Sequence, residues 1–253
     1  MVLFFVLAGM ALVALAHTAP FPFLLEYLDR DRSVWHVPTP GGPPTVYLTF
    51  DDGPNPAATP ALLDVLAAGQ VPATFFLIDR YVDAETAPIV RRMFAEGHAV
   101  ALHSDSRRLV LMSPAELAKT LGRAADRIEQ FGGAQPCGLF RPHGGWRGGQ
   151  MYEGLERADY RLAGWSFRMW DWNWWRPPDP DRLVERLVAR ASDGDIIVLH
   201  DGHHKDPRAN RRGTVETVKA LVPLLRARGF RFGQLCAAAT RAPAPTQEPA
   251  FGE

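Results

Sequence analysis

Seven short apolar runs rich in β-branched and aromatic residues alternate along the chain with longer segments of helical periodicity. This alternation is typical of parallel sheets, in which a helix connects each strand to the next. The sequence therefore predicts an α/β domain, either a closed (β/α) barrel or an open doubly wound sheet. The predicted strands are 46–50, 74–78, 99–102, 138–140, 162–166, 196–199 and 230–235, and the main predicted helices are 60–68, 85–96, 114–131, 180–191 and 214–228.

Charged and imidazole side chains follow most of these predicted strands directly. Because the carboxyl ends of parallel strands open on one face, we expect residues more than a hundred positions apart to meet at one rim. Helix capping or turn formation would explain one or two such residues but explains the whole set poorly. The residues are Asp51, Asp52, His103, Arg141, Asp171, His200 and Asp201.

Composition narrows the classes of partner. The 253 residues are 47% hydrophobic, which is enough to bury one substantial core. Lys plus Arg is 28 and Asp plus Glu is 28, so no net charge attracts nucleic acid or anionic lipid. The chain has no GxxxxGK[ST] phosphate loop, no GxGxxG after a strand and no GxSxG nucleophile elbow. A neutral or weakly charged partner such as a sugar chain fits these limits.

The segment Thr49-Phe50-Asp51-Asp52-Gly53-Pro54 gives the strongest single indication of chemistry. Two adjacent carboxylates after a strand can divide two tasks, one holding a metal ion and the other accepting a proton from water. Asp, Gly and Pro also favour simple turns, so this segment alone leaves both interpretations open.

Four further motifs follow in order, and together with the first they resemble one known family. They are His103-Ser104, Phe140-Arg141-Pro142, Trp170-Asp171-Trp172 and Leu199-His200-Asp201. The chain resembles the polysaccharide deacetylases, carbohydrate esterase family four or NodB homology domain, over roughly residues 45 to 236. The resemblance implies a distorted (β/α) barrel of about seven strand-helix units, a divalent metal such as zinc or cobalt, and removal of N-acetyl groups from an amino-sugar glycan. An O-acetyl polysaccharide esterase and a non-catalytic glycan-binding relative are the alternatives.

The resemblance also implies a role for each matching residue. Asp51 is the implied general base, with Arg141 as the partner that tunes it. His200 is the implied general acid, and Asp171 is the residue that orients His200. The implied metal ligands are Asp52 and His103, and the implied substrate-binding residues are Gly144, Trp172 and Leu199.

The second motif departs from the family pattern, which has a second histidine four residues after the first. Here Arg107 occupies that position, and a guanidinium cannot coordinate a cation. Three hypotheses follow: another loop supplies the missing ligand, the charge of Arg107 partly replaces the metal, or the protein has lost both metal and activity. We favour the first, and the candidate ligands are Asp105, His143, His203 and His204.

The chain ends and the cysteines bear on location. Residues 1–16 are almost wholly apolar, so 1–37 is predicted to be a signal peptide or membrane anchor with its linker. Residues 38–238 then form the catalytic domain, and the Ala/Pro-rich 239–253 form a disordered tail. This predicts an extracytoplasmic protein, with a membrane tether as one option. Cys137 and Cys236 could pair, but we expect two buried free thiols.

Overall fold

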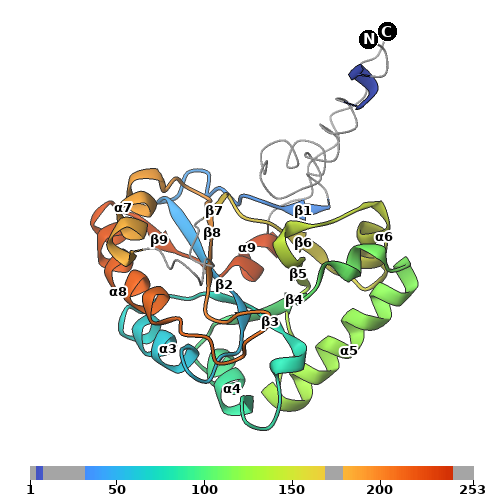
Figure 1. The fold of residues 1–253 in the computed structure, drawn as a ribbon. Helices are drawn as coiled ribbons and strands as arrows, with labels where there is room; N and C mark the ends of the chain where they lie inside the picture. Colours follow the sequence, from blue (N-terminus) through green and yellow to red (C-terminus); the bar gives the residue numbers. More distant parts are fainter. Residues whose placement is uncertain (1–3, 8–31, 169–178, 242–253) are drawn as a thin grey trace.

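The structure is a computed structural model, and it describes residues 4–7, 32–168 and 179–241 (Figure 1). The strands are β1 (Ser33–Val34), β2 (Thr45–Gly53), β3 (Thr74–Ile78), β4 (Ala99–His103), β5 (Leu139–Arg141), β6 (Arg161–Ala163), β7 (Phe167–Arg168), β8 (Ile196–His200) and β9 (Arg231–Phe232). The α-helices are α3 (Thr59–Ala68), α4 (Ala87–Ala95), α5 (Pro114–Gly132), α6 (Gly149–Arg157), α7 (Pro180–Arg190), α8 (Arg212–Ala227) and α9 (Leu235–Arg241). Short 3-10 helices η1 (Asp79–Tyr81), η2 (Arg107–Leu111) and η3 (His143–Gly145) follow β3, β4 and β5.

The strands form one curled parallel sheet, a half-barrel with helices around it (Figure 1). The strand order is β1-β6-β5-β4-β3-β2-β8-β7, and β9 adds to β2. Every strand pair is parallel, so the carboxyl ends of β2, β4, β5 and β8 open on the same side. The predicted distorted (β/α) barrel is therefore confirmed.

The central strands are buried on both faces. Every residue of β3 and β4 is buried, as continuous apolar runs predict for a parallel sheet that is covered on both sides. The rings of Phe50 on β2 and Phe75 on β3 stack with their centroids 5.2 Å apart. This rigid layer fixes the strand ends from which the polar residues project.

The predicted helices are present, and two further helices, α6 and α9, were not predicted. Helix α9 takes up the end of the predicted strand 230–235 and the start of the predicted tail 239–253. Ser113 and Glu116 form the expected capping box at the start of α5. Helix α6 was missed because its glycines give it a weak helical propensity. A Cβ on Gly154 would lie 2.8 Å from a methyl of Leu117, so this glycine permits the close packing of α6 on α5.

Residues just before the expected domain boundary at 37/38 belong to the sheet. Strand β1 pairs with β6, and Trp35 is 2% exposed with its ring packed edge-on against Trp165 at 5.8 Å. A two-residue strand has too little periodicity to be predicted from sequence. Among the described residues, no helix has both the length and the apolar character needed to span a bilayer.

The expectation of two free thiols was wrong, because Cys137 and Cys236 form a disulfide. Cys137 lies just before β5, and Cys236 lies in the first turn of α9. The two residues are 99 positions apart in sequence, so only the packing of α9 near the start of β5 reveals their proximity.

Candidate active site

The carboxyl end of β2 carries both aspartates of the first motif. Neighbouring residues of a regular strand point to opposite faces, but here the register with β3 shifts between Asp51 and Gly53. Asp52 adopts a left-handed backbone conformation with φ of 71°, which aspartate tolerates better than most residues. The irregularity lets both carboxylates contact partners at the same mouth of the sheet.

Gly53 and Gly202 allow the ends of β2 and β8 to approach closely. A Cβ on Gly53 would lie 2.6 Å from Oδ2 of Asp201, and a Cβ on Gly202 would lie 1.9 Å from the carbonyl oxygen of Asp52. Any larger residue at either position would force the two strand ends apart. The glycine of the first motif is thus explained by this close approach.

Arg141 at the end of β5 forms a buried ion pair with Asp51. Its Nη1 donates to Oδ1 of Asp51 at 2.6 Å and to the hydroxyl of Thr49 at 2.9 Å. Its remaining nitrogens donate to the carbonyl oxygens of Ala163 and Gly164, and its side chain is fully buried. This satisfied, charge-assisted pair fixes the position of the Asp51 carboxylate.

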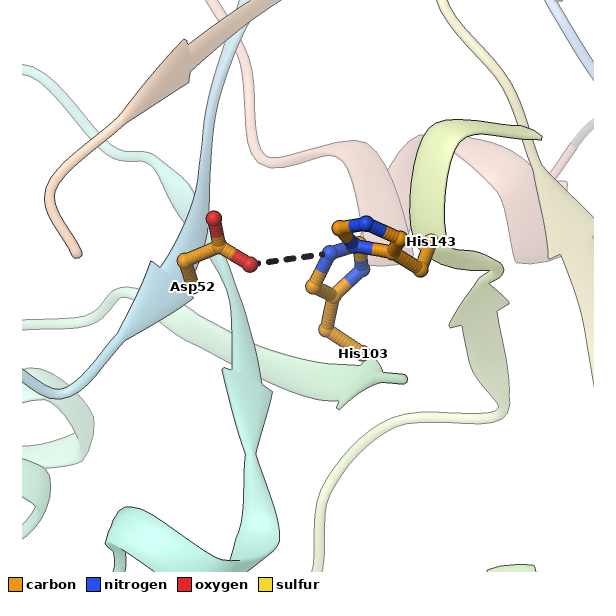
Figure 2. A group of neighbouring side chains, drawn as sticks. All are labelled: Asp52, His103 and His143. Atoms are coloured by element: carbon orange, nitrogen blue, oxygen red, sulfur yellow. Dashed lines mark ion pairs between the residues drawn. The ribbon is translucent and has the colours of Figure 1, made fainter. Parts of the chain in front are cut away.

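Asp52, His103 and His143 point toward one another from three different elements (Figure 2). Asp52 comes from β2, His103 from the end of β4 and His143 from η3 after β5. One potential ligand atom from each lies within 4.8 Å of the other two. A carboxylate with two imidazoles is a common ligand set for zinc and related divalent metals.

The chemistry of Asp52 and His103 fits a cation. Nδ1 of His103 donates to the carbonyl oxygen of Arg141 at 2.8 Å, so Nε2 of the neutral ring carries the free lone pair. That Nε2 lies 3.3 Å from Oδ1 of Asp52, a buried oxygen with no hydrogen-bond partner among the described residues. A cation would satisfy both atoms.

The pKa shifts of this pair have the direction expected of a cation site. Burial raises the pKa of Asp52, but His103 outweighs it and holds that pKa well below its usual range. Burial lowers the pKa of His103, but the carboxylates of Asp51 and Asp52 raise it by more, so the net shift is upward. The negative charge that favours a proton on His103 would also favour a metal cation between the two residues.

His143 is brought to this corner by Ser104. The Ser104 hydroxyl accepts a hydrogen bond from the His143 backbone N–H at 2.8 Å, and the Ser104 N–H donates to the carbonyl of Arg141 at 3.3 Å. Burial and the neighbouring His103 lower the pKa of His143 to about 4. The His143 ring is therefore neutral at pH 7 and has a lone pair available for a metal.

The other candidate ligands have different surroundings. Asp105 forms an ion pair with Arg80 at 3.0 Å. The ring centroids of His204 and His143 are 4.5 Å apart. The ring centroids of His203 and His204 are 4.6 Å apart. Within the described part of the chain, only the set of Asp52, His103 and His143 brings three such ligand atoms together.

The remaining predicted residues are placed as follows. His200 ends β8 and is the register partner of Asp51 on β2. Leu199 has no exposed surface and lies in the hydrophobic core, whereas Gly144 is exposed on η3 beside His143. Asp171 and Trp172 lie outside the described residues.

Two residues of the site had no role in the prediction. Thr49 bridges Arg141 and β8, because its hydroxyl also donates to the carbonyl of Ile197 at 2.9 Å. Asp201 is buried and accepts a hydrogen bond from the Thr59 hydroxyl, and burial raises its pKa to about 7. Asp201 was among the predicted rim residues and in the last motif, but no role of its own was predicted for it.

Comparison with known proteins agrees with this geometry. The family model described as polysaccharide deacetylase matches residues 39–163. The chain is 37% identical over 202 residues to a chitooligosaccharide deacetylase from Bradyrhizobium sp. (strain ANU 289), covering 77% of this chain and 90% of that protein. It is 30% identical over 198 residues to a peptidoglycan-N-acetylglucosamine deacetylase from Bacillus cereus, covering 78% and 88%. A family 4 acetyl xylan esterase from Clostridium thermocellum, solved with a cobalt ion, matches with a TM-score of 0.68 at 29% identity, covering 78% of this chain and 90% of that one.

Proposed function

Since the chain belongs to the polysaccharide deacetylase family, we propose that it hydrolyses N-acetyl groups from an amino-sugar polymer or oligosaccharide with the help of a divalent cation. The similar bacterial proteins named as deacetylases of chitooligosaccharide and of peptidoglycan N-acetylglucosamine support this substrate class. The observation that carries the proposal is the meeting of the Asp51–Arg141 ion pair with the cluster of Asp52, His103 and His143 at one mouth.

We assign the cation to Asp52, His103 and His143. His143 would supply the ligand that Arg107 cannot, in agreement with the hypothesis that another loop completes the site. A bound zinc or cobalt ion would polarise the acetyl carbonyl and make water more acidic. The preserved base, its arginine partner and a complete ligand set argue against a non-catalytic relative.

Asp51 acts as the general base. Its carboxylate takes a proton from the water that attacks the acetyl carbon, and the hydrogen bond from Arg141 holds the carboxylate in position. Arg141 is itself fixed by Thr49 and two backbone carbonyls, so the base is aimed before substrate arrives. Positioned bases of this kind contribute roughly 100- to 10,000-fold in rate.

His200 donates the second proton. As the C–N bond breaks, His200 protonates the departing sugar nitrogen, so acetate and a free amine leave. We assign Asp171 to orient His200, the backbone N–H near Gly144 to the oxyanion, and Trp172 to the pocket for the acetyl methyl and the sugar ring. Leu199 has no exposed surface and is therefore not assigned to this pocket.

We place the protein outside the cytoplasm, where its glycan substrates would be found. The disulfide between Cys137 and Cys236 supports an oxidising compartment. The apolar residues 1–16 support export or a membrane tether.

Acetate release from N-acetylglucosamine oligomers tests the proposal. We expect activity with added zinc or cobalt and loss of activity after chelation. Asp51→Asn should lower kcat by at least about 1,000-fold, because a neutral amide cannot accept the proton. The matched control is Asp64→Asn, which alters an exposed carboxylate paired with Arg92 on the surface and should retain full activity. Full turnover by Asp51→Asn would refute the assigned base, and full turnover by the chelated protein would refute the role of the metal. Acetate release from acetyl xylan tests the alternative of ester cleavage.

A further inference from the structure

Arg107 is an exposed cation beside the candidate metal ligands. It begins η2, directly after the loop that follows His103, and no ion pair joins it to a carboxylate within 32–168 or 179–241. The acidic residue nearest in sequence, Asp105, is already paired with Arg80 at 3.0 Å. Within the described residues, the charge of Arg107 is therefore not paired with a carboxylate.

An aromatic ring holds this guanidinium in place. Cζ of Arg107 lies 5.0 Å from the ring centroid of Trp146, which is 41% exposed. Stacking on an indole orients the guanidinium and leaves its edge N–H groups available to an external acceptor. An exposed tryptophan next to an unneutralised arginine is suited to binding a sugar ring that carries an anionic group.

The pair of Arg107 and Trp146 lies next to the candidate metal ligands. Gly144 has a left-handed φ of 63°, and a Cβ there would lie 3.4 Å from Cδ1 of Trp146 and 4.0 Å from Nε of Arg107. Gly144 directly follows His143, and the charge of Arg107 contributes to the lowered pKa of that histidine. A group bound to Arg107 would thus lie close to the sugar whose acetyl group is attacked.

We infer that Arg107 and Trp146 form a subsite for an anionic substituent, a carboxylate or a phosphate, on the acetylated sugar or on its neighbour. This inference rests on the N-deacetylase activity proposed above. The preferred substrates are then acidic amino-sugar glycans and not neutral N-acetylglucosamine chains. Arg107, at the position where the family has a second histidine, takes on a role in substrate selection.

Charge-matched substrates test this subsite. One pair consists of glycan strands of alternating N-acetylglucosamine and its lactyl ether, with the lactyl carboxylates free or methyl-esterified. A second pair consists of N-acetylglucosamine oligomers ending in a 1-phosphate or in a methyl glycoside. For the wild type we expect kcat/KM to be about three- to tenfold higher on the acidic than on the neutral member of at least one pair, because the acidic member has the lower KM. The kcat/KM values of the two members should become equal as the salt concentration is raised. The pair that shows the preference identifies the anionic group.

Variants then assign the preference to Arg107. Arg107→Gln should abolish the acid-to-neutral ratio of kcat/KM, and Arg107→Lys should restore part of it. Trp146→Ala should weaken binding of both members of a pair. Arg108→Gln is the matched control, because it removes an exposed arginine of the same 3-10 helix that does not stack on Trp146, and its ratio should equal that of the wild type.

Two failures are distinguishable. Equal kcat/KM on acidic and neutral members by the wild type, or an unchanged ratio in Arg107→Gln, would overturn the subsite while acetate release continues. Absence of acetate release from every substrate with every metal would instead refute the proposed function. In that case calorimetric affinities of the same substrate pairs for the wild type and Arg107→Gln decide whether the subsite exists.

Discussion

Two arginines of the active-site mouth, Arg141 at a strand end and Arg107 on the rim, have opposite surroundings. Arg141 is fully buried, and its nitrogens donate to Asp51, Thr49 and two backbone carbonyls. Arg107 is exposed and is held by one contact with a tryptophan ring. The comparison suggests a division of the site: the strand ends are fixed by many buried contacts, whereas the rim can change its residues without disturbing the barrel.

Removing the buried guanidinium should have the largest effect. Arg141→Met leaves Asp51 as an unpaired charge in the interior, which should lower the free energy of unfolding by about 3–5 kcal/mol. Activity should fall with it, because the base loses its orientation. Chemical denaturation measures the stability change, and the double variant with Asp51→Asn should recover much of it. A double variant as unstable as Arg141→Met would show that the ion pair is not the cause.

The second test of the interior is the pH dependence caused by Asp201. Burial raises its pKa to about 7, and its Oδ1 has no hydrogen-bond partner among the described residues. Between pH 4 and 7 the Asp201 carboxyl loses its proton in the unfolded chain but keeps it in the folded protein. The free energy of unfolding therefore falls as the pH rises through this range, by up to about 4 kcal/mol. Asp201→Asn stays neutral and should therefore gain stability relative to the wild type from pH 4 to 8.

Unfolding curves of the chelated proteins at several pH values measure this difference. The amide keeps an oxygen that can accept the hydrogen bond of the Thr59 hydroxyl, so the local structure should persist. Parallel stability curves for wild type and Asp201→Asn would show that the Asp201 carboxyl does not titrate as we expect.

The same division explains what could be predicted from sequence. Asp51, His103 and Arg141 directly follow apolar runs, and parallel topology alone brings such strand ends together. The choice of His143 among four candidate ligands depends on a loop hydrogen bond to Ser104 and on the turn of η3, which no periodicity encodes. The disulfide was missed for a similar reason, because a contact across 99 residues depends on where α9 packs.

The role of His143 gives the third prediction. His143→Ala should weaken zinc or cobalt binding by about 100-fold or more, because the carboxylate and one imidazole that remain make an incomplete site. The fold should be retained, since the side chain lies at the rim. Calorimetric titration measures the affinity, and the visible absorption of bound cobalt reports the ligand set. His204→Ala is the matched control, and equal losses in both variants would contradict the assignment of His143.

The smallest expected effect comes from Ser104, which lies between the two regions. Its hydroxyl accepts from the His143 N–H, and its own N–H donates to the carbonyl of Arg141, so it ties the rim to the strand ends. Ser104→Ala keeps every metal ligand but releases the loop, and it should reduce metal affinity about tenfold, or about 1.4 kcal/mol. Ser106→Ala removes the hydroxyl that caps η2 on the same loop and should leave metal affinity unchanged. If Ser104→Ala bound metal as tightly as the wild type, then η3 itself would fix His143, and the rim would be as rigid as the strand ends.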